Sequence, residues 1–222
     1  MTVLTVDRLN KLSTAAYLEN QWCHIAATTL CACNRPEEIP ILVKYALDRL
    51  QSSPEAQHVM IKQVREALFK IGGAVGIAKS TNALVYLRSV TPPDMLQNAP
   101  LRDYSGGAPN VEKGSEFFET IYGPRYPDVS LQVESACPDM SLWALIYVFA
   151  FVVAYDKVLP FKETSLVLVA ALLPDNVRQL ASYMQGSLNH GASLEELRAV
   201  REAAIDICMW CGISWRAPIP YI

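Results

Sequence analysis

Apolar residues recur at helical spacing along three long stretches of the chain. Each stretch repeats every three or four residues, which places its apolar side chains on one face of a helix. Ser193 followed by Glu196 forms a capping-box pattern that predicts the start of the last helix. The three stripes are Leu42, Tyr45, Ala46 and Leu50; Val64, Ala67, Leu68, Ile71, Val75 and Ala78; and Leu194, Leu197, Val200, Ala204, Ile207 and Cys208. Because no run alternates with the period of a strand, we expect an all-α fold of roughly eight to ten helices.

A segment rich in proline and glycine, residues 91–114, divides the chain into two similar parts. Residues 65–77 align with 201–213 at an offset of 136, with six of thirteen identical, and residues 39–50 align with 177–188 at an offset of 138. Self-similarity in order and spacing indicates a copied helical unit. The sequence therefore predicts a first helical repeat at 1–90, a linker at 91–114 and a second repeat at 115–222.

Composition and charge narrow the class of protein. Apolar residues make up 51% and charged residues 18% of the 222 positions, which is typical of a folded chain rather than a disordered one. A net charge of −3 gives no reason to expect nucleic acid or an anionic membrane surface as a partner. The longest apolar run, residues 142–155, is too short to span a bilayer and is interpreted as a buried core helix. Without a signal-peptide pattern we expect an intracellular protein, cytoplasmic by default, with mitochondria and peroxisomes left open.

Four short segments carry a family resemblance: Phe-Glu-Thr-Ile-Tyr-Gly at 118–123, Cys-Pro-Asp-Met at 137–140, Leu-Pro-Phe-Lys-Glu-Thr-Ser-Leu at 159–166, and Gly-Ser-Leu-Asn-His-Gly-Ala-Ser-Leu-Glu-Glu-Leu at 186–197. With them, residues 117–212 resemble a carboxymuconolactone decarboxylase (CMD) domain of the AhpD-like superfamily, nearest to fungal double-repeat members. The resemblance implies an all-helical fold that forms oligomers, with residues 20–90 as a diverged first copy.

The two activities that the family implies both lack their site residues here. The redox branch uses a Glu upstream of Cys-x-x-Cys-x-x-x-His, whereas residues 166–186 contain no Cys and no His. The decarboxylase branch usually has Arg-Glu where this chain has Thr164-Ser165, and a His where it has Tyr183. The resemblance therefore does not by itself transfer peroxidase or decarboxylase activity.

Three residues remain as catalytic candidates, because they fall in segments that line the family's pocket. Glu163, Tyr183 and His190 offer a carboxylate, a phenol and an imidazole for proton transfer to a small molecule. Their structural alternatives are a carboxylate in a first helical turn, a core tyrosine and a loop histidine. Cys23-His24 occupies the comparable region of the first copy, although adjacent helical residues point in different directions.

Two function hypotheses follow, and whether the chain is an enzyme stays open. The first is a cofactor-independent lyase or isomerase, decarboxylase-like, acting on a small organic acid, lactone or polyketide-like compound. The second is a non-catalytic oligomeric protein that binds a small molecule or acts as a scaffold. A thiol-dependent peroxidase or antioxidant is a remote third. We expect no cofactor and no metal, a small-molecule ligand, and a homodimer or homotrimer.

The remaining motifs are interpreted as structural. Cys208-x-x-Cys211 falls in the last turns of a helix, where the dipole opposes a reactive thiolate, so packing is expected. A zinc site joining Cys31 and Cys33 to this pair fits structural zinc spacing poorly. The recurring pairs Arg65-Glu66 and Arg201-Glu202 are expected to form ion pairs between helices, and Gly72 and Gly76 to allow close helix packing.

Overall fold

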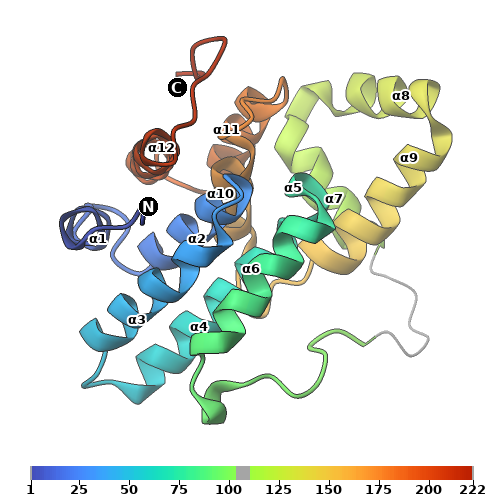
Figure 1. The fold of residues 1–222 in the computed structure, drawn as a ribbon. Coiled ribbons are helices and arrows are strands. Elements are labelled where there is room, and N and C mark those ends of the chain that lie inside the picture. Colours follow the sequence, from blue (N-terminus) through green and yellow to red (C-terminus); the bar gives the residue numbers. More distant parts are fainter. Residues whose placement is uncertain (1, 104–110, 222) are drawn as a thin grey trace.

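The computed structural model describes residues 2–103 and 111–221, and every regular element within them is a helix (Figure 1). The all-α class expected from the sequence is confirmed. The elements are α1 (Val6–Ser13), α2 (Trp22–Ala32), η1 (Pro36–Glu38), α3 (Ile39–Arg49), α4 (Pro54–Lys70), α5 (Gly72–Val75), α6 (Ile77–Val90), η2 (Pro93–Met95), α7 (Val111–Tyr122), η3 (Gly123–Arg125), α8 (Tyr126–Ala136), α9 (Pro138–Leu142), the π-helix η4 (Trp143–Val153), α10 (Phe161–Leu172), α11 (Leu180–Asn189) and α12 (Leu194–Trp210).

Two helices, α2 and α10, form the centre of the main core. Residues 23–32 of α2 and 164–171 of α10 are buried without interruption, and the two helices pack against each other. A helix that is apolar on all sides has no amphipathic stripe, which is why neither produced one of the three stripes in the sequence. Around them, α3, α4 and α12 cover α2, while α11 and α12 cover α10 (Figure 1).

A second, smaller core lies between α7 and η4, in the part of the molecule that also carries α8 and α9 (Figure 1). Gly114 lets α7 approach closely, because a Cβ there would lie 2.7 Å from the Ala150 backbone. The expectation of a buried core helix at 142–155 is wrong in part. Phe149, Ala150 and Val153 are buried, but Trp143 and Tyr147 are exposed, because η4 packs on one side only.

Gly76 ends one helix and begins the next instead of continuing a long helix. The stripe expected over 64–78 is interrupted, since α4 ends at Lys70 and Gly76, with φ +98°, separates α5 from α6. This left-handed backbone strongly favours glycine. Close packing belongs instead to Gly73, where a Cβ would lie 2.8 Å from Val148 of η4. The linker is also shorter than expected, because α7 begins at Val111 and Gly114 lies inside it.

A buried network of charges joins the two halves. Glu66 of α4 receives hydrogen bonds from Nη1 and Nη2 of Arg102. Nη2 also donates to the Val152 carbonyl of η4, and Nε donates to the Phe151 carbonyl. Lys70 donates to Thr164 Oγ1 of α10 at 2.7 Å and to the Val153 carbonyl at 3.0 Å.

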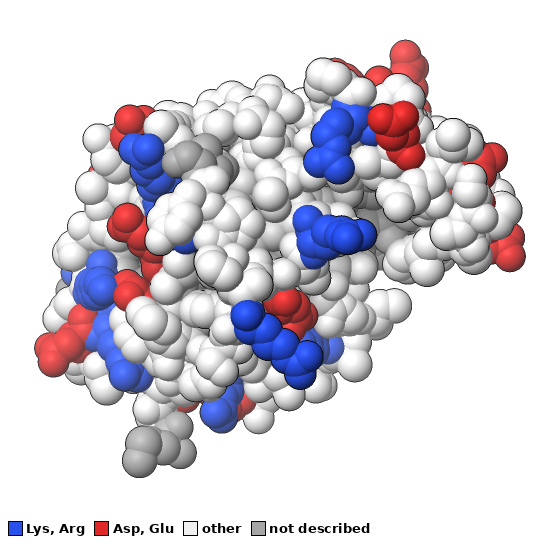
Figure 2. Space-filling view, turned by 90° about the horizontal axis from the view of Figure 1, so that it is seen from above, with Lys and Arg blue, Asp and Glu red and all other residues white. Residues whose placement is uncertain are grey.

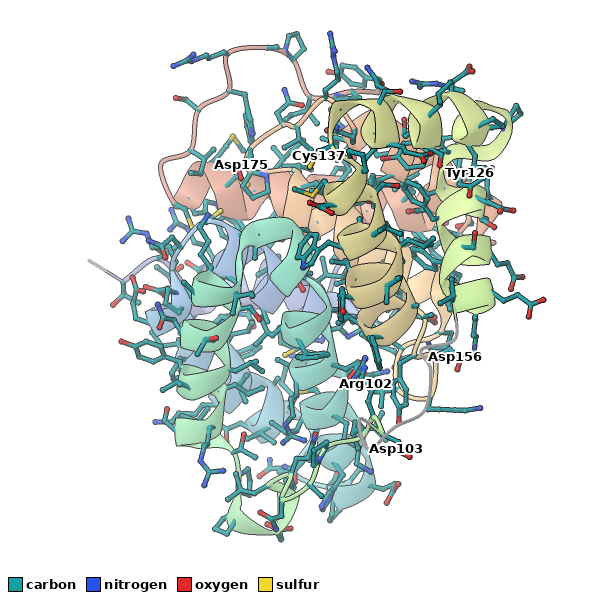
Figure 3. All side chains as sticks on the ribbon, turned by 90° about the vertical axis from the view of Figure 1, so that its right-hand side faces the viewer. Arg102, Asp103, Tyr126, Cys137, Asp156 and Asp175 are labelled. Atoms are coloured by element: carbon teal, nitrogen blue, oxygen red, sulfur yellow. The ribbon has the colours of Figure 1, made fainter. Side chains whose placement is uncertain are left out.

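Figure 3 places Arg102 between the helices of the first half and η4. Burial lowers the pKa of Lys70 to about 7, and Glu66, 3.9 Å away, partly opposes that shift. The network replaces water with fixed donors and acceptors from four segments of the chain.

The recurring Arg-Glu pairs do not join helices in the expected way. Arg65 donates to the Met95 carbonyl at 2.9 Å, and Arg201 donates to the Pro220 carbonyl at 2.8 Å. Each arginine therefore holds the extended segment that follows its own group of helices. Only Glu66 enters a buried ion pair, and its partner Arg102 comes from the segment after α6.

Removing Arg102 tests the importance of this network. We expect Arg102→Met to lower the free energy of unfolding by about 3–5 kcal/mol, because Glu66 would remain buried without its cation. Adding Glu66→Met should restore part of the loss. Urea unfolding followed by circular dichroism measures both, with Arg88→Met on the exposed face of α6 as a control. An Arg102 variant as stable as the control would show that the network does not stabilise the fold.

Candidate functional site

The cavity that contains a sequence-predicted site residue lies where three helices begin. We call it the Glu163 pocket, and its volume is about 420 Å³. It is lined by Tyr17, Glu19, Asn20, Gln21, Gln63, Lys162, Glu163, Ser193 and Glu196. These residues come from the segment before α2, from α4, and from the first turns of α10 and α12, so the folded core brings together positions far apart in sequence.

Two acceptor atoms in this pocket are buried without a hydrogen-bond partner among the described residues. One is Oε2 of Glu163, in the first turn of α10, and the other is Oε1 of Gln21, at the N-cap of α2. An unsatisfied buried acceptor costs about 1–3 kcal/mol, and more when it is charged. A rotation of these side chains toward the pocket would let a bound ligand donate hydrogen bonds to them and remove that cost.

Of the charged residues in the pocket, Lys162 and Glu196 form an ion pair. Lys162 Nζ lies 2.8 Å from Glu196 Oε1, and this hydrogen bond raises the pKa of Lys162. Burial alone would raise the pKa of Glu196, but hydrogen bonds from Lys162 and the Ser193 backbone outweigh it and lower the pKa. Ser193 and Glu196 also complete the capping box expected from the sequence. The ammonium group is therefore already paired, and Glu163 and Glu19 leave the pocket with an excess of negative charge.

The dipoles of three helices also affect the electrostatics of the Glu163 pocket. The N-terminal ends of α2, α10 and α12 border the pocket, and each end carries partial positive charge from backbone N–H groups. α2 and α10 have no side-chain cap, whereas α12 is capped by Ser193. These dipoles favour a carboxylate at Glu163 and would also favour negative charge that develops on a bound molecule.

Tyr183 and His190 lie in the aromatic cluster of the second core instead. Tyr183 packs against Tyr122, with ring centroids 6.1 Å apart, and burial raises the pKa of its phenol. The His190 ring stacks on Phe117 at 4.4 Å and meets Phe161 edge-on at 5.8 Å. Both ring nitrogens are buried without a partner among the described residues, and this burial lowers the pKa of His190 to about 4.

The Cys23-His24 pair is buried in α2. Cys23 lines a neighbouring groove of about 660 Å³, which shares Glu19, Asn20 and Gln63 with the Glu163 pocket. Its thiol lies 3.7 Å from the Met60 sulfur, and burial raises its pKa to about 12. His24 points elsewhere in the core and is kept neutral, because burial lowers its pKa to about 4. The two side chains therefore do not form a nucleophile with its base.

The sequence proposed Glu163 as a candidate but did not indicate the residues that line the pocket with it. No sequence motif contains Gln21, Gln63 or Glu19. Lys162 is next to Glu163, but a Lys-Glu pair is too common to indicate a site. The one available signal was position, since Lys162 and Glu163 follow Pro160 at the start of a helix and Glu196 closes a capping box. Only the packing of α4 and α2 against α10 shows that these ends meet.

The comparisons identify two curated relatives that cover most of the chain. The protein named peroxisomal protein 2 of Saccharomyces cerevisiae is 27% identical over 277 aligned residues, covering 98% of this chain and 98% of the relative. The protein of the same name from Schizosaccharomyces pombe is 31% identical over 199 residues, covering 88% of this chain and 89% of the relative. No family model and no solved structure matches the chain.

The two buried histidines predict how stability depends on pH. The unfolded chain protonates them below about pH 6.5, whereas the folded protein holds their pKa near 4. The free energy of unfolding should therefore be highest above pH 6.5 and fall as pH decreases toward 4, by up to about 2 kcal/mol per histidine between pH 7 and 5. Urea titrations at both pH values measure this fall.

His190→Phe, which keeps the stacking on Phe117, should reduce the fall, and His58→Gln, a partly exposed histidine of α4, is the matched control. An equal pH dependence in wild type and His190→Phe would contradict a neutral buried His190.

Proposed function

This chain belongs to the family of the two yeast proteins named peroxisomal protein 2, and from that membership we propose that it acts in peroxisomes on a small molecule bound in the Glu163 pocket. The names of the relatives support the compartment. They state no activity, so the chemistry has to be argued from the pocket itself. Within the described residues, no helix combines the length and apolarity needed to cross a bilayer.

We propose further that the fold is of the CMD or AhpD-like type, built from two copies of a three-helix unit. The lengths of the helices support this: α2, α3 and α4 have 11, 11 and 17 residues, and α10, α11 and α12 have 12, 10 and 17. The Ser caps of the two long helices, Ser53 and Ser193, are 140 positions apart, one helical turn from the sequence offset of 136. The units are 1–90 and 115–222, and the central pair α2 and α10 would be equivalent helices.

The proposed reaction is cofactor-independent proton transfer with Glu163 as general base. The observation that carries it is the buried, unpartnered Oε2 of Glu163 inside a polar cavity. This carboxylate oxygen would accept a proton from a carbon next to a carbonyl group. The N-termini of α2 and α10 would stabilise the negative charge that develops on the substrate oxygen. In this proposal Tyr183 and His190 have a structural role: they pack α11 against the aromatic side chains of α7 and do not exchange protons with the substrate.

Charge in the pocket favours a neutral substrate within the classes expected from the sequence. Glu19, Glu163 and Glu196 face a single ammonium group, Lys162, which Glu196 already neutralises. An organic acid anion would be repelled, whereas a hydroxylated lactone or polyketide-like carbonyl compound could donate to Glu163 and Gln21. We therefore propose a reaction of the lyase or isomerase type on a neutral carbonyl compound.

Deuterium exchange tests the proposal directly. Wild-type protein in D₂O should accelerate exchange of the acidic C–H of α-acetyl-γ-butyrolactone, a neutral lactone probe, as measured by proton NMR. Glu163→Gln should lose at least about 100-fold of that acceleration. Glu195→Gln, an exposed carboxylate in the first turn of α12, should retain it. No acceleration by wild type across a panel of such lactones and β-keto esters, or equal rates in both variants, would refute proton transfer by Glu163.

A second candidate function, a non-catalytic oligomeric binding protein, is favoured by an apolar surface over α8, α9 and η4. Its exposed side chains are Leu131 (64%), Met140 (51%), Leu142 (57%), Trp143 (43%) and Tyr147 (59%). α9 contacts both α8 and η4, so these side chains come from one part of the molecule. On the face seen in Figure 2, acidic and basic side chains lie beside one another in small groups, and broad uncharged areas separate the groups.

Self-association over this surface is the testable part of that candidate. We expect light scattering at micromolar concentration to give a dimer or trimer, because burying five large apolar side chains is favourable. Leu142→Glu combined with Tyr147→Glu should give a monomer. Val6→Glu, an equally exposed apolar residue of α1, should leave the assembly intact. A monomeric wild type would contradict the interface.

A further inference from the structure

Three cysteines that are distant in sequence meet where α2 and α12 end. Cys33 is the C-cap of α2, Cys208 lies in the last turn of α12, and Cys211 is the C-cap of α12. The sulfur atoms of Cys33 and Cys208 are 3.8 Å apart, and Cys211 is near enough to Cys33 for each thiol to shift the pKa of the other. Cys33 therefore lies between the two cysteines of the Cys-x-x-Cys motif.

The cluster differs in exposure from the other thiols. Cys33 and Cys211 are half-buried, so a small reagent can reach them, while Cys208 is buried beneath. Cys23 and Cys31 are buried in α2, and Cys137 is exposed at the start of α9. Small reagents can thus reach two members of this cluster and Cys137, but only the cluster offers a second thiol in contact.

The location of the cluster keeps the Cys33 and Cys211 thiols protonated at rest. Cys33 and Cys211 sit at the negative ends of two helix dipoles, which disfavour a thiolate. The hydrogen bond with Cys208 raises the pKa of Cys33 to about 12, and burial adds to this. Such a site is suited to slow modification, not to the rapid turnover of a thiol peroxidase.

We propose that Cys33 forms an intramolecular disulfide with Cys211 or Cys208 when the protein meets a low-molecular-weight disulfide. The product covalently fastens the end of α2, in the first half of the chain, to the end of α12, in the second half. This assignment concerns the end of α2 opposite to Gln21 and does not depend on the proposed activity of the Glu163 pocket.

The chemistry balances with one oxidant. The thiolate of Cys211 attacks the reagent RSSR, forming a Cys211–SR mixed disulfide and releasing RS⁻, which takes up the proton lost by Cys211. The thiolate of Cys33 then attacks the Cys211 sulfur and releases the second RS⁻, which takes up the proton lost by Cys33. Two protein thiols are oxidised and one RSSR is reduced to two RSH. The same exchange can pass the bond to Cys208, which already touches Cys33.

The required movement is small. A disulfide brings two sulfur atoms to about 2 Å, so the Cys33 and Cys208 sulfurs must approach by roughly another 2 Å. The end of α2 can supply this shift, because Cys33 is its final cap and Asn34, with φ +56°, turns the chain away directly after it.

Oxidised glutathione is the probe, applied to Cys137→Ser protein so that exposed thiols do not link two molecules. After alkylation of the remaining thiols under denaturing conditions, mass spectrometry of the tryptic digest should show the Cys33 peptide cross-linked to the peptide containing Cys208 and Cys211. Cys31→Ser, a change in the same helix, should preserve the cross-link, and Cys33→Ser should abolish it. The oxidised protein should also melt higher by on the order of 5–10 °C, reversibly with dithiothreitol, because the bond closes a very long loop.

Three results would overturn the proposal: glutathione remaining on Cys33 or Cys211 without a cross-link, a cross-link that persists in Cys33→Ser, or full alkylation of all three cysteines after oxidation. Circular dichroism establishes that each variant is folded. If Cys33→Ser does not fold, the double variant Cys208→Ser with Cys211→Ser must lose the cross-link instead.

Discussion

The buried network of Glu66, Lys70 and Arg102 fixes how the two halves of the molecule meet. Taking a carboxylate, an ammonium and a guanidinium group out of water is costly, so each must find its partners in one arrangement. Those partners are the Thr164 hydroxyl and the carbonyls of the last three residues of η4. A sliding of α4 against α10 would leave at least one charge unpaired, and the network therefore selects one register for the core.

That register sets the geometry of the pocket. Thr164, which holds Lys70, directly follows Glu163, so the contact that anchors α10 also aims its first turn at the cavity. α2 packs along α10 and brings the uncapped Gln21 to the same place.

α2 runs from the Glu163 pocket to the cluster of Cys33, Cys208 and Cys211. Its N-terminal end faces the Glu163 pocket, where backbone N–H groups favour negative charge, and its C-terminal end carries Cys33, where the dipole disfavours a thiolate. One buried helix therefore presents opposite electrostatic environments at its two ends. A carboxylate lies at the end suited to it, and protonated thiols lie at the other.

The sequence alone determined the all-helical class and the capping box of α12, because these depend on local spacing and on residues close in the chain. Glu163 stays a prediction. The sequence did not reveal the two central helices, since helices that are buried on all sides lose the periodic pattern from which helices are read. It also placed 142–155 in the core, because apolar composition does not show which side of a helix finds a partner.

Only the tertiary structure brought Gln21 and Gln63 to Glu163, Arg102 to Glu66, and Cys33 to Cys208. Each of these pairs joins residues between 36 and 175 positions apart. Such contacts follow from how whole helices pack, and packing depends on the sum of many side-chain contacts that no short motif encodes.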